Sequence, residues 1–339
     1  MRRRVMLVSA GTAAAAALAA CSASLEPGTN EGDVLHLALN QTESHPSYIA
    51  LDRWGEFMEE ETDGRWTIDV YPNETLGAQA EAMQLVSDGS VEMAIVSGPQ
   101  LENLNRDFIA LNLPTTFDDI DHQMRVVHDP AIVGELYSSL EETNNFTVLG
   151  GFTQGARSVY TTFGPVETPE DLSGMKLRVQ ESELNVAMAE GLGAAATPMA
   201  YGELYTGLQS GVVDAAENNE VSYATQRHYE VAPHWSYTNH LVGLDYLIIN
   251  TAMLESMTQE DRAVFDEGWE LARAEHVELW LQATEDAIAE AEAGGATFHE
   301  VDDSIFFDAL EPLADRFLTT DLQWQVYDAA RAASERPTR

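Results

Sequence analysis

The longest periodic segment of the chain, residues 259–293, limits the folds that the rest of the sequence can adopt. Thr258 and Asp261 have the spacing of an N-terminal capping box, and Gly294-Gly295 ends the pattern. At 1.5 Å per residue such a helix is about 50 Å long, which is enough to lie across two lobes. Apolar side chains recur along it every three or four positions, and we expect His276 among them to be a core histidine. This stripe comprises Phe265, Trp269, Ala272, His276, Leu279, Trp280, Ala283 and Ala287.

Short alternating segments precede this helix and predict an α/β fold. Besides strands at 146–152 and 241–250 and a helical segment at 306–333, we expect strands at 34–39, 66–71 and 93–96, with helices at 48–62 and 78–87 between them. Strand, helix and strand in this order imply a mostly parallel sheet with right-handed crossovers. With 339 residues, 45% of them hydrophobic, the chain can bury a core in each of two lobes.

The charge of the chain excludes some partners. It carries 57 acidic and 17 basic residues, for a net charge of -40. Nucleic acid is an unsuitable partner, because phosphate binding needs a basic face. An anionic ligand would approach against the overall field, so we expect any anion site to be locally positive. His122 and His128 lack a zinc-like spacing, and we expect them on the surface with no metal or cofactor bound.

The first 33 residues are typical of a processed leader and a tether. Residues 2–4 are basic, residues 5–18 form an apolar run too short to span a bilayer comfortably, and small residues precede Cys21. This pattern resembles a lipoprotein signal at 1–20, in which the thiol of Cys21 takes a lipid and anchors the chain outside the cytoplasm. An ordinary signal with a chance cysteine is the alternative. Residues 21–33 would form a flexible tether.

The central stretch 151–219 gathers candidates for binding an anion. If residues 176–180 form a strand, Arg178 and Gln180 project from the same face. A guanidinium offers a planar fork that matches a carboxylate, which lysine cannot reproduce. Arg157 is a second candidate, although an ordinary salt bridge would also explain it. Asn218 and Asn219 end a further expected strand, and their amides can both donate to and accept from hydroxyls.

Two further candidates follow the first expected strand, and one precedes a later helix. Ligands of open α/β sheets lie beyond the carboxyl ends of strands, which places Asn40 and His45 within reach of a ligand. A turn that caps the following helix is an equal alternative for this segment. Tyr201 precedes a helix, where an aromatic ring usually fills the core.

These motifs, in this order, resemble the extracytoplasmic solute-binding proteins of TRAP (tripartite ATP-independent periplasmic) transporters. The resemblance rests on Y-P-N-E-T-L-G at 71–77, L-R-V at 177–179 and V-D-A-A-E-N-N at 213–219, and it covers nearly the whole mature chain. It implies a two-lobed periplasmic-binding-protein fold with mixed, mostly parallel sheets and a long spine helix. Lobe I would comprise 34–152 and 241–257, lobe II would comprise 153–240 and 295–339, and the helix 258–294 would span both.

The resemblance also implies a function and roles for these residues. Arg178 would clamp a substrate carboxylate, Arg157 would assist it, and Tyr201 would pack against the ligand, which is passed to membrane permease subunits. The A-E-N-N form, with R-V-Q-E-S and the segment 228–240, is similar to the branch that binds sugar acids such as uronates. The hydroxyls of such a ligand would be bound by Asn218, Asn219, Gln180, Asn40 and His45.

Three other functions remain open at this point. The ligand could be a C4-dicarboxylate or another small carboxylate, and the protein could present it to a sensor instead of a permease. An extracytoplasmic carbohydrate-active enzyme with paired carboxylates is the third. No nucleophile elbow, zinc-protease motif or phosphate loop supports an enzyme.

Overall fold

The computed structural model describes residues 33–334, all within one compact unit. The expected leader at 1–20, Cys21 and the tether up to residue 32 lie outside the described residues. Within the described part, no helix combines the length and the apolarity that a bilayer span requires.

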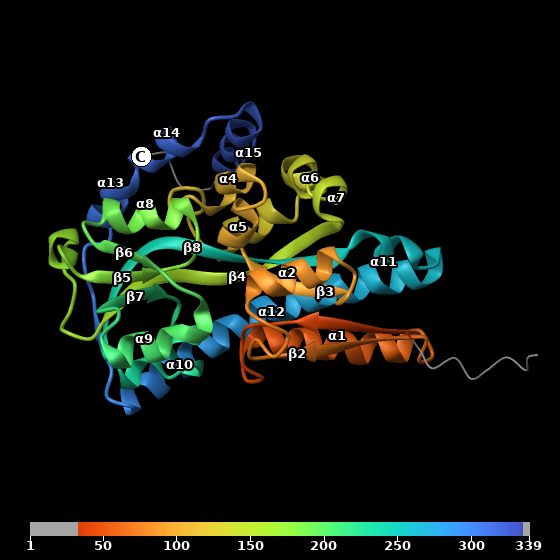
Figure 1. Cartoon of the computed structure of the whole chain (residues 1–339), viewed down its shortest axis with the longest axis horizontal. Helices are drawn as coiled ribbons and strands as arrows, with labels where there is room; N and C mark the ends of the chain where they lie inside the picture. Colours follow the sequence, from red (N-terminus) through yellow and green to blue (C-terminus); the bar gives the residue numbers. More distant parts are fainter. Residues whose placement is uncertain (1–32, 335–339) are drawn as a thin grey trace, which may run out of the picture. The chain divides into compact units, whose positions relative to one another are not determined.

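The described strands form one nine-stranded mixed sheet (Figure 1). Its order is β2-β1-β3-β8-β4-β7-β5-β6, and β9 pairs with β8. Parallel pairs join β1 to β2 and β3, β5 to β6 and β7, and β8 to β9, whereas β3–β8, β4–β7 and β4–β8 are antiparallel. The strands are β1 (Asp33–Ala38), β2 (Trp66–Tyr71), β3 (Met93–Ser97), β4 (Phe146–Thr161), β5 (Lys176–Val179), β6 (Ala195–Pro198), β7 (Ala215–Asn218), β8 (His234–Asn250) and β9 (Thr297–His299).

The two long strands β4 and β8 join the two halves of the sheet. The sequence predicted strands at 146–152 and 241–250, but the structure extends them to 16 and 17 residues. Register shifts interrupt their pairing between Thr153 and Ala156 and between Arg157 and Val159. These bulges break the period-two pattern without ending the strand, because a bulge adds a residue to one strand only.

The helices cover both faces of this sheet (Figure 1). The predicted helices at 48–62 and 78–87 are present within two residues at each end, whereas 306–333 forms three helices. Pro312 begins the second of these and cannot continue the hydrogen-bond ladder of the first. The helices are α1 (Pro46–Glu61), α2 (Gln79–Ser87), α3 (Gly98–Glu102), α4 (Ile109–Asn112), α5 (Ile120–Val127), α6 (Pro130–Ser138), α7 (Glu141–Asn144), α8 (Glu183–Gly191), α9 (Leu204–Ser210), α10 (Glu220–Thr225), α11 (Thr251–Ser256), α12 (Gln259–Ala293), α13 (Ser304–Leu310), α14 (Pro312–Phe317) and α15 (Asp321–Ala332).

The helix α12 has the bounds that the sequence predicts, and it packs against both α1 and α10. These partners come from 34–152 and 153–240, so α12 contacts both predicted lobes. Six of the eight residues of its predicted stripe are buried, and Leu279 and Ala283 are half-buried. Trp54 of α1 fills the space left by Gly268, where an added Cβ would lie 2.4 Å from the Trp54 ring. His276 is fully buried and stacks on Phe152 at 4.0 Å, as expected for a core histidine.

The expectation that His122 and His128 lie on the surface is wrong. His122 is 1% exposed, and its Nε2 donates to the carbonyl of Ala330 at 2.8 Å. His128 is half-buried, and its Nε2 donates to the carbonyl of Gly151 at 3.1 Å. Both imidazoles therefore satisfy backbone acceptors of the core, which spacing in the sequence does not reveal.

Candidate functional site

A cavity lies where the carboxyl ends of several strands meet the middle of β4 and β8. Its empty volume is about 480 Å³, a figure that includes the open mouth. Strand ends are where open α/β sheets bind ligands. Most of its lining is polar, and the lining residues are Asn40, Gln41, Glu74, Ala78, Gln79, Ser97, Gln100, Gln154, Arg157, Arg178, Gln180, Glu181, Met199, Ala200, Tyr201, Asn218 and Asp245.

Arg178 brings an uncommitted positive charge to this cavity. Its side chain is 2% exposed, and its Nε and Nη2 donate to the carbonyl of Met199 at 3.0 and 2.8 Å. Nη1 is buried, and no group among residues 33–334 accepts a hydrogen bond from it. No carboxylate of the described residues lies within ion-pair distance of Arg178. Burial lowers the pKa of its guanidinium, which nevertheless stays charged because arginine does not deprotonate in proteins.

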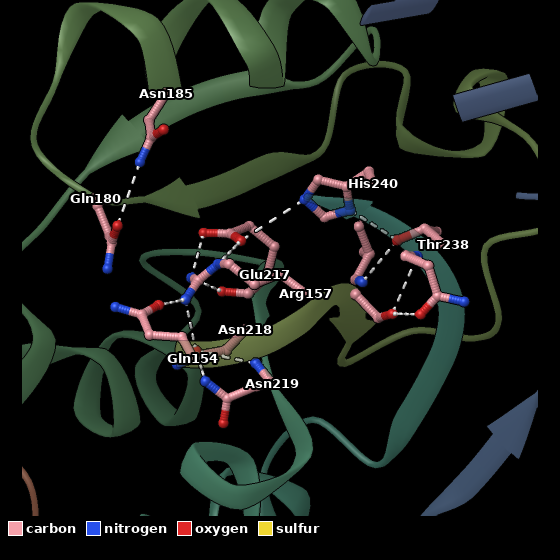
Figure 2. A network of polar contacts seen from close by, with 12 residues as sticks. Gln154, Arg157, Gln180, Asn185, Glu217, Asn218, Asn219, Thr238 and His240 are labelled. Carbon is pink, nitrogen blue, oxygen red and sulfur yellow. Dashed lines mark hydrogen bonds and ion pairs between the residues drawn. The ribbon is translucent and has the colours of Figure 1, made fainter. Parts of the chain in front are cut away.

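Arg157 is also buried, but the protein itself occupies all its N–H donors (Figure 2). Nε and Nη2 donate to the carboxylate of Glu217 at 2.6 and 2.7 Å, and Nη2 also donates to the Glu217 carbonyl at 2.9 Å. Nη1 donates to the Oδ1 of Asn218 at 2.9 Å and to the Oε1 of Gln154. Arginine has five N–H donors, so none is left for a ligand in this arrangement. Arg157 therefore forms a salt bridge, which was the alternative to ligand binding that the sequence left open for it.

The partner of Arg157 is held as a carboxylate. Glu217 is 1% exposed. Burial opposes its ionisation, but the charge and hydrogen bonds of Arg157, together with the His240 ring 3.6 Å away, outweigh burial and hold the Glu217 pKa at about 2. Thr238 orients His240 through a hydrogen bond of 2.8 Å to Nδ1 (Figure 2). A buried ion pair of this kind fixes geometry more than it adds stability.

Local backbone features make room for this network. Gly155 has a φ of 64° in the β4 bulge, and an added Cβ would lie 2.7 Å from the Trp280 ring. On β8, a Cβ at Gly243 would lie 2.6 Å from the Oε1 of Gln154 and 2.9 Å from the Cδ of Arg157. A side chain at Gly243 would therefore displace Gln154 and Arg157, which line the cavity, whereas one at Gly155 would displace Trp280.

The predicted amide contacts divide into two sets. Gln180 and Asn218 line the cavity, and the Oδ1 of Asn218 accepts from Arg157 and from the backbone and side chain of Asn219. Asn219 is not part of the lining. It is the N-cap of α10, and its Oδ1 accepts from the backbone N of Ser222 at 2.7 Å. Asn219 thus holds Asn218 in place from behind.

The two residues expected after the first strand are separated in the same way. Asn40 lines the cavity, and its buried Oδ1 has no hydrogen-bond partner within the described part of the chain. His45 is absent from the lining and caps α1, where its Nδ1 accepts from the backbone N of Ser47 at 3.2 Å. Burial lowers the His45 pKa to about 3 and keeps the ring neutral. His45 therefore caps a helix, which was the alternative to ligand binding that the sequence left open for this segment.

Tyr201 lines the cavity from the short helical turn Tyr201–Glu203. Its hydroxyl donates to the Oε1 of Gln41 at 3.3 Å and to the carbonyl of Ser222 at 3.5 Å. Burial raises its pKa to about 12, so the hydroxyl remains a neutral donor. The ring therefore adds a largely apolar wall with one polar end.

Hydrogen bonds across the cavity link 33–152 with 153–240. Besides the contact between Tyr201 and Gln41, the Nδ2 of Asn103 donates to the carbonyl of Glu181 at 2.8 Å, and Arg106 pairs with Glu183. The segments 33–152 and 153–240 therefore make polar contacts beside the cavity, which Gln41, Glu181 and Tyr201 line.

The sequence reasoning missed the acidic residues of the site. It expected a locally positive pocket, but three acids, Glu74, Glu181 and Asp245, line the cavity together with the two arginines. Asp245 is a charged residue inside the apolar run 241–250, and this interruption was the available signal. Glu74 is in the turn after β2 with a φ of 56°, and burial raises its pKa, whereas the backbone N of Gly202 and the charge of Arg178 lower it.

Comparisons with known proteins agree with this fold and show the family of the chain. The family model of bacterial extracellular solute-binding proteins, family 7, matches residues 37–321. A solute-binding protein of Chromohalobacter salexigens is 37% identical over 297 residues, which cover 83% of this chain and 86% of the relative.

Solved structures extend the likeness to three dimensions. A TRAP periplasmic solute-binding protein of Anaerococcus prevotii with bound α/β-D-glucuronate is 37% identical, with a TM-score of 0.86 over 88% of this chain and 97% of that chain. One from Bradyrhizobium with α/β-D-galacturonate is 29% identical, with a TM-score of 0.84 over 88% of this chain and 100% of that chain. The predicted two-lobed α/β fold is confirmed. The chain belongs to the bacterial extracellular solute-binding proteins of family 7, the solute-binding components of TRAP transporters.

Proposed function

We propose that this protein captures a uronate or a related sugar acid outside the cytoplasm and delivers it to the membrane subunits of a TRAP permease. The observation that carries the proposal concerns Arg178, a residue of the cavity lining whose Nη1 is buried and has no acceptor among residues 33–334. Leaving a buried charged donor without a partner is costly, so a ligand carboxylate at this position is favoured. Related structures with D-glucuronate and D-galacturonate bound support a sugar acid over a C4-dicarboxylate.

The other residues have supporting roles in this proposal. Arg157 orders Gln154 and Asn218 instead of contacting the carboxylate, because its donors are occupied. Tyr201 packs on the sugar ring. Ligand hydroxyls bind the polar groups of the lining, and Asn219 and His45 position that lining from outside it. The residues proposed to bind hydroxyls are Asn218, Gln180 and Asn40.

A thermal-shift and calorimetric screen of the mature chain tests this function. We expect D-glucuronate or D-galacturonate to raise the apparent melting temperature and to bind with one ligand per chain, because a ligand that binds only the folded state stabilises it by mass action. Malate and succinate serve as C4-dicarboxylate controls. Tighter binding of either control than of both uronates, or turnover of a uronate during the titration, would refute the proposal.

We also propose that Cys21 carries a lipid that anchors the protein to the outer face of a membrane. The support is the lone cysteine after the basic and apolar leader. Cys21→Ser is expected to move the protein from the membrane fraction to the soluble fraction of the cell envelope, with uronate affinity unchanged. A wild-type protein already found in the soluble fraction would contradict the anchor.

A further inference from the structure

The charged residues around the cavity can accommodate only one ligand carboxylate. Arg157 and Arg178 are the cations among the described residues that line it. Glu217 balances the charge of Arg157, whose N–H donors are all occupied. Of the two arginines that line the cavity, only Arg178 has a donor atom without an acceptor among the described residues. A ligand with a second carboxylate would find no further uncommitted cation.

Asp245 lies in the same cavity and has no cation of its own. It is on β8 opposite Ser97 of β3 and Phe152 of β4, and it is 3% exposed. Burial raises its pKa to about 6, although a hydrogen bond from Gln154 and the charge of Arg157 lower it. Asp245 is therefore mostly a carboxylate at pH 7.

The orientation of Asp245 is fixed by Gln154. The Nε2 of Gln154 donates to the Oδ1 of Asp245, and its Oε1 accepts from Arg157. The ion pair of Glu217 with Arg157 thus positions the amide of Gln154, and this amide in turn holds the carboxylate of Asp245. A carboxylate has about four acceptor positions, of which Gln154 occupies one. The others can accept from ligand hydroxyls.

The hydrogen bonds of the two arginines lead to different lining residues. Gln154 links Arg157 to Asp245, whereas Arg178 donates to the carbonyl of Met199. Since the ligand carboxylate is assigned to Arg178, Asp245 faces another part of the ligand. A hydroxyl there donates to Asp245, whereas a second carboxylate meets a like charge.

We propose that Asp245 restricts the site to sugar acids with a single carboxylate, by accepting hydrogen bonds from ligand hydroxyls and repelling a second carboxylate. The inference rests on the proposed function and adds the residue that sets the substrate class. Hexuronates are accepted, and aldarates, which carry a carboxylate at each end of the sugar chain, are rejected. Placing like charges side by side in an interface costs several kcal/mol, so the discrimination is expected to be large.

The test compares D-glucuronate with D-glucarate by calorimetry, with displacement titrations for the weaker ligand. Wild type is expected to bind glucuronate about 100-fold more tightly at pH 7. Asp245→Asn is expected to reduce this ratio by about tenfold or more, through weaker glucuronate binding and tighter glucarate binding. Asp69→Asn makes the same chemical change at an exposed residue of β2 and is expected to leave the ratio unchanged. Comparing ratios between variants cancels the difference in shape between the two ligands.

Several outcomes would overturn the inference. One is a wild-type protein whose affinity for glucarate is within about tenfold of its affinity for glucuronate. Another is a folded Asp245→Asn variant in which the ratio of these two affinities is unchanged. Near-UV circular dichroism checks the fold, and Asp245→Ser replaces the asparagine variant if that one unfolds. A wild type that binds neither acid but binds succinate would instead refute the proposed function. If the wild type binds glucuronate well but Asp245→Asn leaves the ratio of glucuronate to glucarate affinity unchanged, only the role of Asp245 is refuted.

Discussion

Replacing Arg178 with lysine is expected to weaken sugar-acid binding by about 10- to 100-fold, since a hydrogen bond to a charged group contributes about 1.5–3 kcal/mol. Lysine keeps the charge but loses the planar fork that donates to Met199 and to the ligand at the same time. Its ammonium can serve one of these acceptors well but not both. Calorimetry with D-glucuronate on the purified variant measures the effect.

A matched control separates this role from a general effect of losing an arginine. Arg262 is on the outer surface of α12 and pairs with Asp266 at 2.8 Å. Arg262→Lys is expected to leave the affinity unchanged. An Arg178→Lys variant with wild-type affinity would show that the carboxylate binds elsewhere, whatever the result at Arg262.

Replacing Glu217 with glutamine is expected to lower the free energy of unfolding by about 3–5 kcal/mol, because the change leaves the Arg157 charge buried without its counter-ion. Urea denaturation at pH 7 measures this loss. The folded-state pKa of Glu217 is about 2, below its ordinary value of 4.5, so the ionised pair contributes its full stability above pH 4.5. That contribution is lost as the pH falls from 4.5 towards 2.

The same substitution at an exposed pair provides the control. Glu230 lies 3.8 Å from Arg227, and both side chains are well exposed. Glu230→Gln is expected to change the stability by less than about 1 kcal/mol, as is usual for surface pairs. A Glu217→Gln variant as stable as wild type would mean that the network around Arg157 does not hold the lining of the cavity in place.

The fold was largely predictable because its signals are local. Hydrophobic periodicity gives α12 its bounds, and period-two alternation predicts that Arg178 of β5 and Gln180, just after β5, reach the same cavity. The full lengths of β4 and β8 were not predictable, since bulges interrupt the alternation near Thr153 and Arg157. The breaks between α13, α14 and α15 follow from Pro312 and from the turn after Phe317.

The site was predictable only in part, because its electrostatics depend on pairs that are distant in sequence. Arg157 and Glu217 are 60 residues apart, and their pairing decides that Arg157 has no donor for a ligand. Composition predicted a positive pocket, whereas the structure adds Asp245 from an apolar strand. Helix capping, which local sequence could not distinguish from ligand binding, accounts for the positions of His45 and Asn219.

A crystal structure of the mature protein with D-glucuronate tests the central claim most directly. We expect a carboxylate oxygen of the ligand at about 2.7–2.9 Å from the Nη1 of Arg178, the distance of a charge-assisted hydrogen bond. We also expect Arg157 to keep its bonds to Glu217. A ligand whose carboxylate binds away from Arg178, with Nη1 still lacking an acceptor, would contradict the proposed role of Arg178.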